Sequence, residues 1–178
     1  MIKVEPAAGD TLRGWKVAGQ STAWKAYCRN KKSLAIDLHD PRGIEIVLKL
    51  VAGADVFSEN FKPGAMKRLG LGYDALRALN PALVYVSHKG FLPGPYEHRT
   101  ALDEVVQMMG GLAYMTGPQG RPLRAGTSVN DIMGGMFGAI GAMAALMQRT
   151  RTGRGREVQS ALFENNVLRS EEHTSELQ

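Results

Sequence analysis

Helical and strand-like patterns of hydrophobic positions alternate along the chain. In "DPRGIEIVLKLVAGA", residues 40–54, apolar side chains recur every three or four positions after the Asp40-Pro41 pair, a favourable cap and first-turn combination. This pattern predicts a helix. The next segment, "ADVFSEN", is short and apolar, which is typical of a buried strand. Strands separated by helices in this way favour an α/β fold with a parallel sheet.

The same alternation extends over the rest of the sequence. Strands are predicted at 1–6, at 54–60, at 82–90, after "CRNKK" and after the turn in "TGRGREVQSAL". Helices are predicted at 40–54, 63–69, 73–80 and 101–110, with a long one from Asp131 and the start of an amphipathic one in "ALFENNVL", residues 161–168. Apolar positions on these elements supply the core candidates: Ile2, Val47, Val56, Val84, Val86, Val105, Phe137, Ile140 and Leu146.

The long helix has an unusual composition. From Ile132 to Met147 it contains no charge, and four of these sixteen residues are glycine. The run is shorter than a membrane span, so we interpret it as a buried core helix. Glycines at 134, 135 and 138 either allow tight helix packing or let a ligand approach the backbone closely.

Asp131, the carboxylate at the head of this run, has two interpretations. Aspartate is among the best helix N-caps, and the apolar run needs one. The positive end of the helix dipole would also keep the carboxylate ionised at neutral pH. An ionised, partly desolvated carboxylate can attack an activated acyl group. The two roles are compatible.

Composition narrows the classes of protein. The chain has 178 residues, 44% hydrophobic, and a formal net charge of +5. Its basic residues form small clusters without interleaved aromatic residues or a helix-turn-helix pattern, which disfavours nucleic acid as a partner. The N-terminus has no apolar segment of a signal peptide. Cys28 is the only cysteine, so no disulfide can form within the chain and we expect a cytoplasmic location.

Both ends of the sequence look interrupted. The last ten residues, "RSEEHTSELQ", lack the glycine-rich alternation of helix and strand patterns that precedes them. They resemble the translation of a sequencing adapter, so we interpret 169–178 as a non-native tail. The first six, "MIKVEP", resemble the end of a strand with nothing before it. We therefore expect a fragment truncated at both ends, with residues 1–168 forming part of one domain.

Several residues are candidates for binding a ligand. Asn60 and Phe61 follow a predicted parallel strand, at the edge where open α/β sheets bind ligands. Phe61 suits stacking on a base, and Arg68 suits a phosphate. Pro63 would begin a helix whose free N–H groups favour an anion. A solvated basic turn is the alternative interpretation of the same residues.

Other candidates are more isolated. Arg13 lies in a glycine-flanked turn, "GDTLRGW", and Asp103 opens a helix, where a dipole partner and a catalytic acid are both possible. No GxxxxGK, GxGxxG or GxSxG motif is present, which excludes a P-loop, a dinucleotide fingerprint and a nucleophile elbow. The histidines show no metal-ligand spacing, so no metal site is expected.

Five segments together resemble the class III CoA-transferases, the family of formyl-CoA transferase and the carnitine CoA-transferases. They are "KVEPAAGDTLRGW", "RNKKSLAIDLHDPRG", "ADVFSENFKPGAMKRLGLGYDALRALNPALVYVSHKGF", "DEVVQMMGGLAYMTG" and "RAGTSVNDIMGGMFGAIGAMAAL…TGRGREVQSAL". Their order and spacing match the family over nearly all of residues 2–168.

The resemblance implies a mechanism and a set of site residues. An aspartate, here Asp131, attacks an acyl-CoA thioester to form a mixed aspartyl anhydride and free CoA thiolate. An incoming carboxylate then takes the acyl group, and CoA returns to the second acyl. Asp103 matches a glutamate that assists catalysis in formyl-CoA transferase. The residues that match coenzyme contacts are Arg13, Asn60, Phe61 and Arg68. Backbone N–H groups near Gly134 and Gly135 are candidate oxyanion donors.

The resemblance also implies the architecture: a Rossmann-like parallel sheet with flanking helices, part of the large domain of an interlaced homodimer. Coenzyme A would be a substrate that carries the acyl group, with no further cofactor and no membrane partner. We expect the 178-residue chain alone to lack transferase activity.

Two other functions remain open. The same family includes 2-methylacyl-CoA racemases, but Tyr114 stands where those carry a histidine. A coenzyme-binding module without catalysis is the second alternative. The acyl groups cannot be read from the sequence. Arg121, Arg124 and Lys89 are candidates for pairing with a substrate carboxylate.

Overall fold

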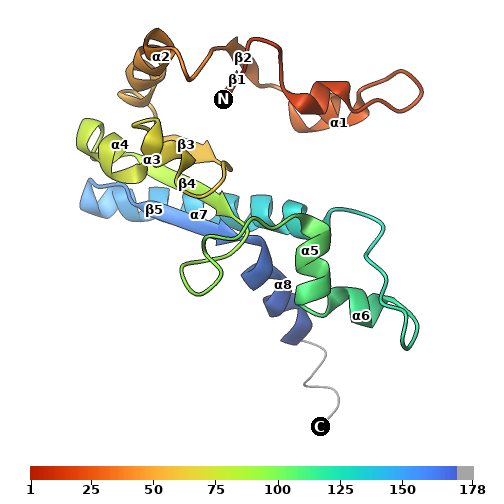
Figure 1. The fold of residues 1–178 in the computed structure, drawn as a ribbon. Coiled ribbons are helices and arrows are strands. Elements are labelled where there is room, and N and C mark those ends of the chain that lie inside the picture. Colours follow the sequence, from red (N-terminus) through yellow and green to blue (C-terminus); the bar gives the residue numbers. More distant parts are fainter. Residues whose placement is uncertain (172–178) are drawn as a thin grey trace. The chain divides into compact units, whose positions relative to one another are not determined.

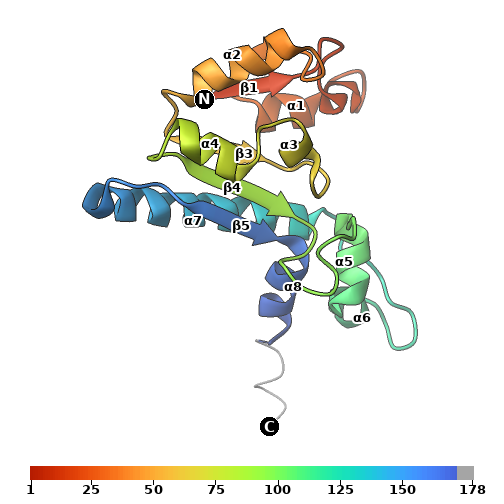
Figure 2. The same ribbon diagram turned by 60° about the vertical axis from the view of Figure 1, so that its left-hand side comes forward.

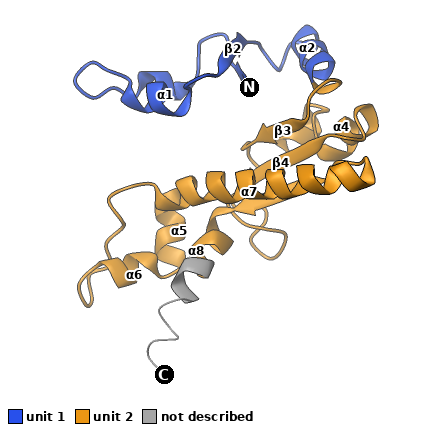
Figure 3. Ribbon diagram, turned by 180° about the vertical axis from the view of Figure 1, so that it is seen from behind, with its two compact units in different colours: residues 1–50 blue, residues 51–178 orange. Residues whose placement is uncertain are grey.

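The computed structural model describes residues 1–171, with side chains described up to residue 167 (Figure 1). The chain divides into two compact units, Met1–Leu50 and Val51–Gln178, which are coloured separately in Figure 3. The predicted boundary after Leu168 falls inside the last helix, and most of the segment interpreted as a non-native tail lies outside the described residues. That interpretation stays a prediction.

Unit 1 contains a two-stranded parallel sheet and short helices. Its elements are, in chain order, β1 (Ile2–Glu5), the 3-10 helix η1 (Thr11–Gly14), α1 (Thr22–Tyr27), β2 (Lys32–Ala35) and α2 (Pro41–Val51), whose last residue begins unit 2. The strands pair from Ile2 opposite Lys32 to Glu5 opposite Ala35. α2 begins where the sequence predicts, because the Asp40 carboxylate accepts a hydrogen bond from the backbone N–H of Arg42 at 2.9 Å.

Unit 2 is built on a three-stranded parallel sheet in the order β3-β4-β5. Its elements are β3 (Val56–Glu59), α3 (Ala65–Arg68), α4 (Tyr73–Leu79), β4 (Val84–Lys89), α5 (Asp103–Met109), α6 (Leu112–Thr116), α7 (Val129–Thr152), β5 (Glu157–Ala161) and α8 (Leu162–Glu171). Each element predicted from the sequence is present. The helices η1, α1 and α6 were not predicted, since they are too short to show a hydrophobic period.

The central strand of unit 2 is covered on both faces. On one face, Val84 and Val86 are buried against Ala145 of α7, which runs alongside the sheet in Figures 1 and 2. On the other face, Tyr85 stacks on Phe57 with ring centroids 5.2 Å apart and meets the edge of Tyr73. The strand alternation therefore places an apolar layer under α7 and an aromatic layer under α4.

The strands are parallel, as predicted, with β1-β2 paired in unit 1 and β3-β4-β5 in unit 2. The list of core residues needs correction. Among the core candidates, Val47, Val84 and Val86 are buried, Leu146 packs partly against the core and Phe137 is half-buried. Four candidates are wrong, because their side chains lie on outward faces: Ile2, Val56, Val105 and Ile140.

The interpretation of α7 as a buried core helix is only half correct. One face packs against β4, β5 and α8, whereas five large apolar side chains on the rest of the helix are exposed: Ile132, Met136, Ile140, Met143 and Met147. With 24 residues, α7 is the one helix in the described part of the chain that is long and apolar enough to cross a membrane. The sequence-based expectation that this helix is shorter than a membrane span was wrong, because it counted only the uncharged residues 132–147. Core helices of soluble proteins pass the same test, so this is weak evidence for a membrane.

Two glycines of α7 should respond oppositely to substitution. A Cβ on Gly138 would lie 2.3 Å from Cε1 of His88, whose ring packs between α7 and Ser58, whereas a Cβ on Gly135 would meet nothing within 4 Å. We expect Gly138→Ala to destabilise the chain by about 1–3 kcal/mol through overpacking. Gly135→Ala should stabilise it by up to about 1 kcal/mol through helix propensity. Denaturant unfolding of both variants measures the difference, and equal effects would contradict this packing.

Candidate functional site

Asp131 lies in the first turn of α7 but is not its N-cap. The helix begins at Val129, with Ser128 in the cap position and no side-chain hydrogen bond from it. The prediction of Asp131 as the cap is therefore wrong by three positions. Instead its side chain is exposed at the start of the helix. A carboxylate that is not used as a cap remains available for other chemistry.

The carboxylate that caps α7 belongs to Asp103, the first residue of α5. Its Oδ1 accepts hydrogen bonds from the backbone N–H of Asn130 at 2.6 Å and of Asp131 at 3.3 Å. The Asp103 residue is only 6% exposed. It therefore satisfies two N–H groups that the helix itself leaves unpaired, and it fixes the backbone that carries the Asp131 side chain.

Gln107, one turn after Asp103 on the same helix, completes this frame. Its side-chain amide donates to Asp103 Oδ2 and to the carbonyl of Thr127, at 3.3 Å in the latter case. Its carbonyl accepts from the N–H of Ala125 at 2.6 Å. The loop before α7 is thus tied to α5. Sequence reasoning missed Gln107, although its spacing of four residues from Asp103 on a helix was a usable signal.

The helix dipole alone would lower the pKa of Asp131, but the structure raises it. Removal of water around its carboxylate, followed by the nearby charge of Asp103, raises the pKa of Asp131 above the ordinary 3.8. The residue as a whole remains exposed, so this carboxylate is partly desolvated and still accessible. A raised pKa makes the ionised form more basic and hence a better nucleophile, because nucleophilicity rises with basicity within one class of group.

Asp131→Asn should raise the free energy of unfolding slightly at neutral pH, by at most about 0.5 kcal/mol. Because folding raises the pKa of this carboxyl, ionising it costs the folded state more than the unfolded state. The gain should shrink as the pH falls through the raised pKa and vanish below 3.8, where the carboxyl is neutral in both the folded and the unfolded state. Denaturation curves at neutral pH and at about pH 3 test this. A variant less stable than the parent at neutral pH would contradict it.

The candidate oxyanion donors are not supported. Gly134 and Gly135 lie in the second turn of α7, where backbone N–H groups donate to carbonyls one turn earlier. A Cβ on Gly134 would lie 2.9 Å from a methyl group of Leu162, so this glycine serves helix packing. At the start of the helix, the backbone N–H groups of Asn130 and Asp131 donate to the Asp103 carboxylate.

A second group of predicted residues lies where β3 ends. Asn60 and Phe61 follow the strand directly, as predicted, and both are exposed. The buried Glu59 side chain accepts hydrogen bonds from the backbone N–H of Phe61 at 2.8 Å and from the hydroxyl of Ser87 on β4. Glu59 thus fixes the start of this connection, a role that its position at a strand end did not reveal in the sequence.

A cavity of about 210 Å³ opens beside this connection. Its lining contains three lysines, Lys62, Lys67 and Lys89, and two carboxylates, Glu59 and Glu157. Lys89 Nζ lies 3.7 Å from the Glu59 carboxylate, so the lysines outnumber the carboxylates by one and the balance of charge favours an anion. The carboxyl edge of β3 and β4 is therefore a candidate anion site, as expected for a parallel sheet.

Arg68 ends α3, in the same connection as Asn60 and Phe61, and is exposed. α3 has a single turn, so the predicted anion site at its start has little helix dipole behind it. Among the described residues, no hydrogen bond or ion pair joins these residues to Asp131 or Asp103. No group of three or more His, Cys, Asp or Glu in the described part of the chain could hold a metal ion.

Arg13 belongs to unit 1, whereas the other predicted site residues belong to unit 2. Its guanidinium forms a bidentate ion pair with the buried Glu5 and lies over the ring of Trp24, 3.7 Å from its centroid. Glu5 and Trp24 were both missed in the sequence. A carboxylate at a strand end followed eight residues later by an arginine has no local period that would indicate their contact.

Comparisons with known proteins agree on one family. The sequence model described as CoA-transferase family III matches residues 1–175. Succinyl-CoA:glutarate CoA-transferase of Mus musculus is 41% identical over 173 residues, which cover 94% of this chain and 40% of that protein. Succinyl-CoA–D-citramalate CoA-transferase of Chloroflexus aurantiacus is 39% identical, over 100% of this chain and 46% of that protein.

Solved structures show the same relationship. The crystal structure of a CAIB/BAIF family protein from Brucella suis superposes with a TM-score of 0.86 at 40% identity, and the match covers 93% of this chain and 46% of that one. The chain therefore spans less than half the length of each of these three relatives.

Proposed function

Because the chain belongs to CoA-transferase family III, we propose that the protein of which it forms part is an enzyme that transfers CoA between an acyl-CoA thioester and a free carboxylic acid. The relatives named for succinyl-CoA, with glutarate or D-citramalate, support this class of reaction. The observation that carries the proposal is Asp131, an accessible carboxylate on a backbone held by the buried Asp103.

In the proposed reaction the Asp131 carboxylate attacks the thioester carbonyl. A carbon–oxygen bond forms, the carbon–sulfur bond breaks, and CoA leaves as its thiolate. The acceptor carboxylate then attacks the acyl carbon and releases Asp131, and the thiolate attacks the acceptor's own carbonyl to give the new thioester and the donor acid. Each step exchanges one carboxylate or thiolate for another, so no oxidant, metal or net proton transfer is needed.

The structure supports this role through positioning. Forming an anhydride from a thioester is uphill, and correct placement of the reactants contributes up to roughly 7–11 kcal/mol toward such steps. The network of Asp103 and Gln107 holds the first turn of α7 and the loop before it. Asp103, both of whose oxygens already accept hydrogen bonds, is proposed to act through Asp131 rather than on the substrate.

Coenzyme contacts are proposed at two places. In unit 2, Asn60, Phe61 and Arg68 lie on one connection next to a cavity lined by lysines. Phe61 is 47% exposed and offers a ring on which an adenine can stack. In unit 1, Arg13 offers a guanidinium. Binding energy from this nucleotide end, far from the reacting carbon, can hold the thioester against the nucleophile.

The racemase alternative receives no support from the comparisons or the geometry. Tyr114, at the position of the racemase histidine, lies on α6 and is 65% exposed. Four expectations stay predictions. They are a cytoplasmic location, an interlaced homodimer, the lack of a further cofactor, and the inactivity of the 178-residue chain alone.

An assay of CoA exchange tests the proposed function. The longer protein would be supplied with succinyl-CoA and a panel of acceptors that includes glutarate, citramalate and acetate, and new thioesters would be measured by mass spectrometry. We expect a new acyl-CoA with at least one dicarboxylate. Thioester hydrolysis alone, or binding without exchange across the panel, would favour a different enzyme or a binding module.

A further inference from the structure

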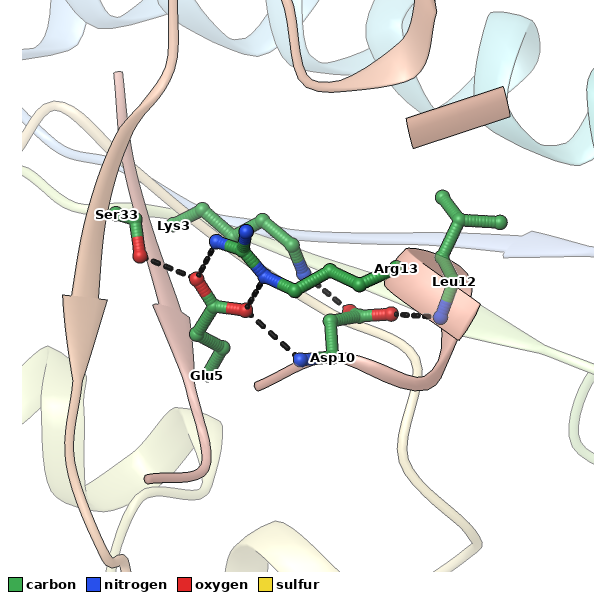
Figure 4. Close-up of polar contacts among 6 residues, drawn as sticks. All are labelled: Lys3, Glu5, Asp10, Leu12, Arg13 and Ser33. Carbon is green, nitrogen blue, oxygen red and sulfur yellow. Dashed lines mark hydrogen bonds and ion pairs between the residues drawn. The ribbon is translucent and has the colours of Figure 1, made fainter. Parts of the chain in front are cut away.

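The Glu5 carboxylate is the centre of a polar cluster in unit 1 (Figure 4). Glu5 ends β1 and is 4% exposed. Its two oxygens accept from Nε and Nη2 of Arg13, at 2.9 and 2.6 Å. The two contacts form a fork that fixes both the position and the plane of the guanidinium.

Two more donors hold the carboxylate itself. The Ser33 hydroxyl, from β2, donates to one oxygen, and the backbone N–H of Asp10 donates to the other at 2.8 Å. These hydrogen bonds, that of Arg13 above all, hold the pKa of Glu5 well below its usual range. Glu5 is therefore a fixed negative charge that cannot rotate without losing four hydrogen bonds.

The remaining surroundings fix the arginine from other sides. One contact is the Trp24 ring, 3.7 Å from the guanidinium carbon to the ring centroid. Another is the backbone of Gly9, where an added Cβ would lie 3.0 Å from Cδ of Arg13. Gly9 has φ +85, a conformation that side chains rarely adopt, so glycine meets both demands of this site.

This arrangement uses only two of the donors of Arg13. A guanidinium has five N–H donors on two usable edges. The edge of Nε and Nη2 is taken by Glu5, whereas the edge of Nη1 and the second hydrogen of Nη2 has no partner among the described residues. The Arg13 side chain is 43% exposed, so water and solutes reach it. The free edge matches the oxygens of a phosphate.

We propose that Glu5 is a positioning residue that holds Arg13 on Trp24 so that its free edge receives a phosphate of the coenzyme's nucleotide end. This inference rests on the proposed function, which supplies the phosphorylated nucleotide. An arginine without this frame would sample many rotamers, and ordering it on binding would lower the affinity. The same contacts would serve only to stabilise the fold if no phosphate bound there, and the experiment separates these roles.

The test measures ligand binding to the 178-residue chain in a Trp15→Phe background, which leaves Trp24 as the only tryptophan. Adenosine 3′,5′-bisphosphate, adenosine and CoA are titrated, with Trp24 fluorescence as the readout and calorimetry for affinity. Glu5→Gln is expected to weaken bisphosphate and CoA binding by roughly tenfold and to leave the weak adenosine binding unchanged. Asp40→Asn is the matched control, since Asp40 forms an exposed ion pair with Arg42 in the same unit.

The binding results separate the positioning role of Glu5 from the proposed function. If the parent chain binds neither CoA nor the bisphosphate, both this inference and the coenzyme sites of the proposed function fail. If the parent binds both and Glu5→Gln binds equally well, the positioning role is wrong while the proposed function stands. Should Glu5→Gln unfold, Arg13→Lys keeps a charge that can pair with Glu5 but lacks the second edge. Bisphosphate binding unchanged in that variant would overturn the proposal.

Discussion

Replacing Asp131 by asparagine is expected to abolish CoA exchange in the longer protein, with kcat reduced on the order of 10⁴-fold or more. An amide nitrogen or oxygen cannot form the anhydride that the carboxylate forms. The backbone N–H at this position, which donates to Asp103, is retained, so the fold is preserved. Initial rates with saturating succinyl-CoA and acceptor, measured on freshly purified protein, give the loss.

Asp74→Asn is the matched control for this substitution. Asp74 is also an exposed aspartate in the first turn of a helix, α4. Its replacement by asparagine is expected to leave kcat unchanged. Mass spectrometry must confirm that the asparagine at position 131 has not deamidated to aspartate. Normal exchange by an intact asparagine variant would refute the nucleophile assignment.

Asp103→Ala is expected to be the most destabilising single change at the site, lowering the free energy of unfolding by about 3–4 kcal/mol. It removes the acceptor for two backbone N–H groups of α7 and leaves the Gln107 amide with one partner fewer. Asp103→Asn should cost less, because an amide oxygen can still accept from Asn130. Denaturant unfolding of the 178-residue chain measures both variants.

The neighbour Glu104 offers the control for this prediction. It lies in the same turn of α5, but its carboxylate pairs with Arg124 at the surface, at 3.0 Å. Glu104→Gln should change stability by less than about 0.5 kcal/mol. If Asp103→Ala and Glu104→Gln had equal small effects, the buried frame described for α7 would not contribute to holding it.

Elements with a clear local period were predictable, and their long-range partners were not. α2 follows from its apolar spacing and the Asp40 cap, β3 from a short apolar segment, and β4 from a β-branched run. The predicted start of α7 was wrong because its capping side chain, Asp103, lies 27 residues before Asn130 in the sequence. A capping residue on another helix leaves no trace in the local sequence.

The same reason explains what was missed at the candidate sites. Asn60 and Phe61 were placed correctly, because the end of a parallel strand is a general binding position. The ion pair of Arg13 with Glu5 joins a turn to a strand, and no periodic signal connects them. The apolar run of α7 showed a helix but could not show that only one of its faces is covered.

The most direct test of the central claim is to trap the anhydride at Asp131. The longer protein would be mixed with succinyl-CoA and then with hydroxylamine, whose attack on the aspartyl carbonyl of the anhydride releases succinate and leaves a hydroxamate that peptide mass spectrometry can locate. The account predicts a hydroxamate at Asp131 that depends on succinyl-CoA and is absent from Asp131→Asn. CoA exchange at full rate with no modification there, or with the label on another acid, would contradict it.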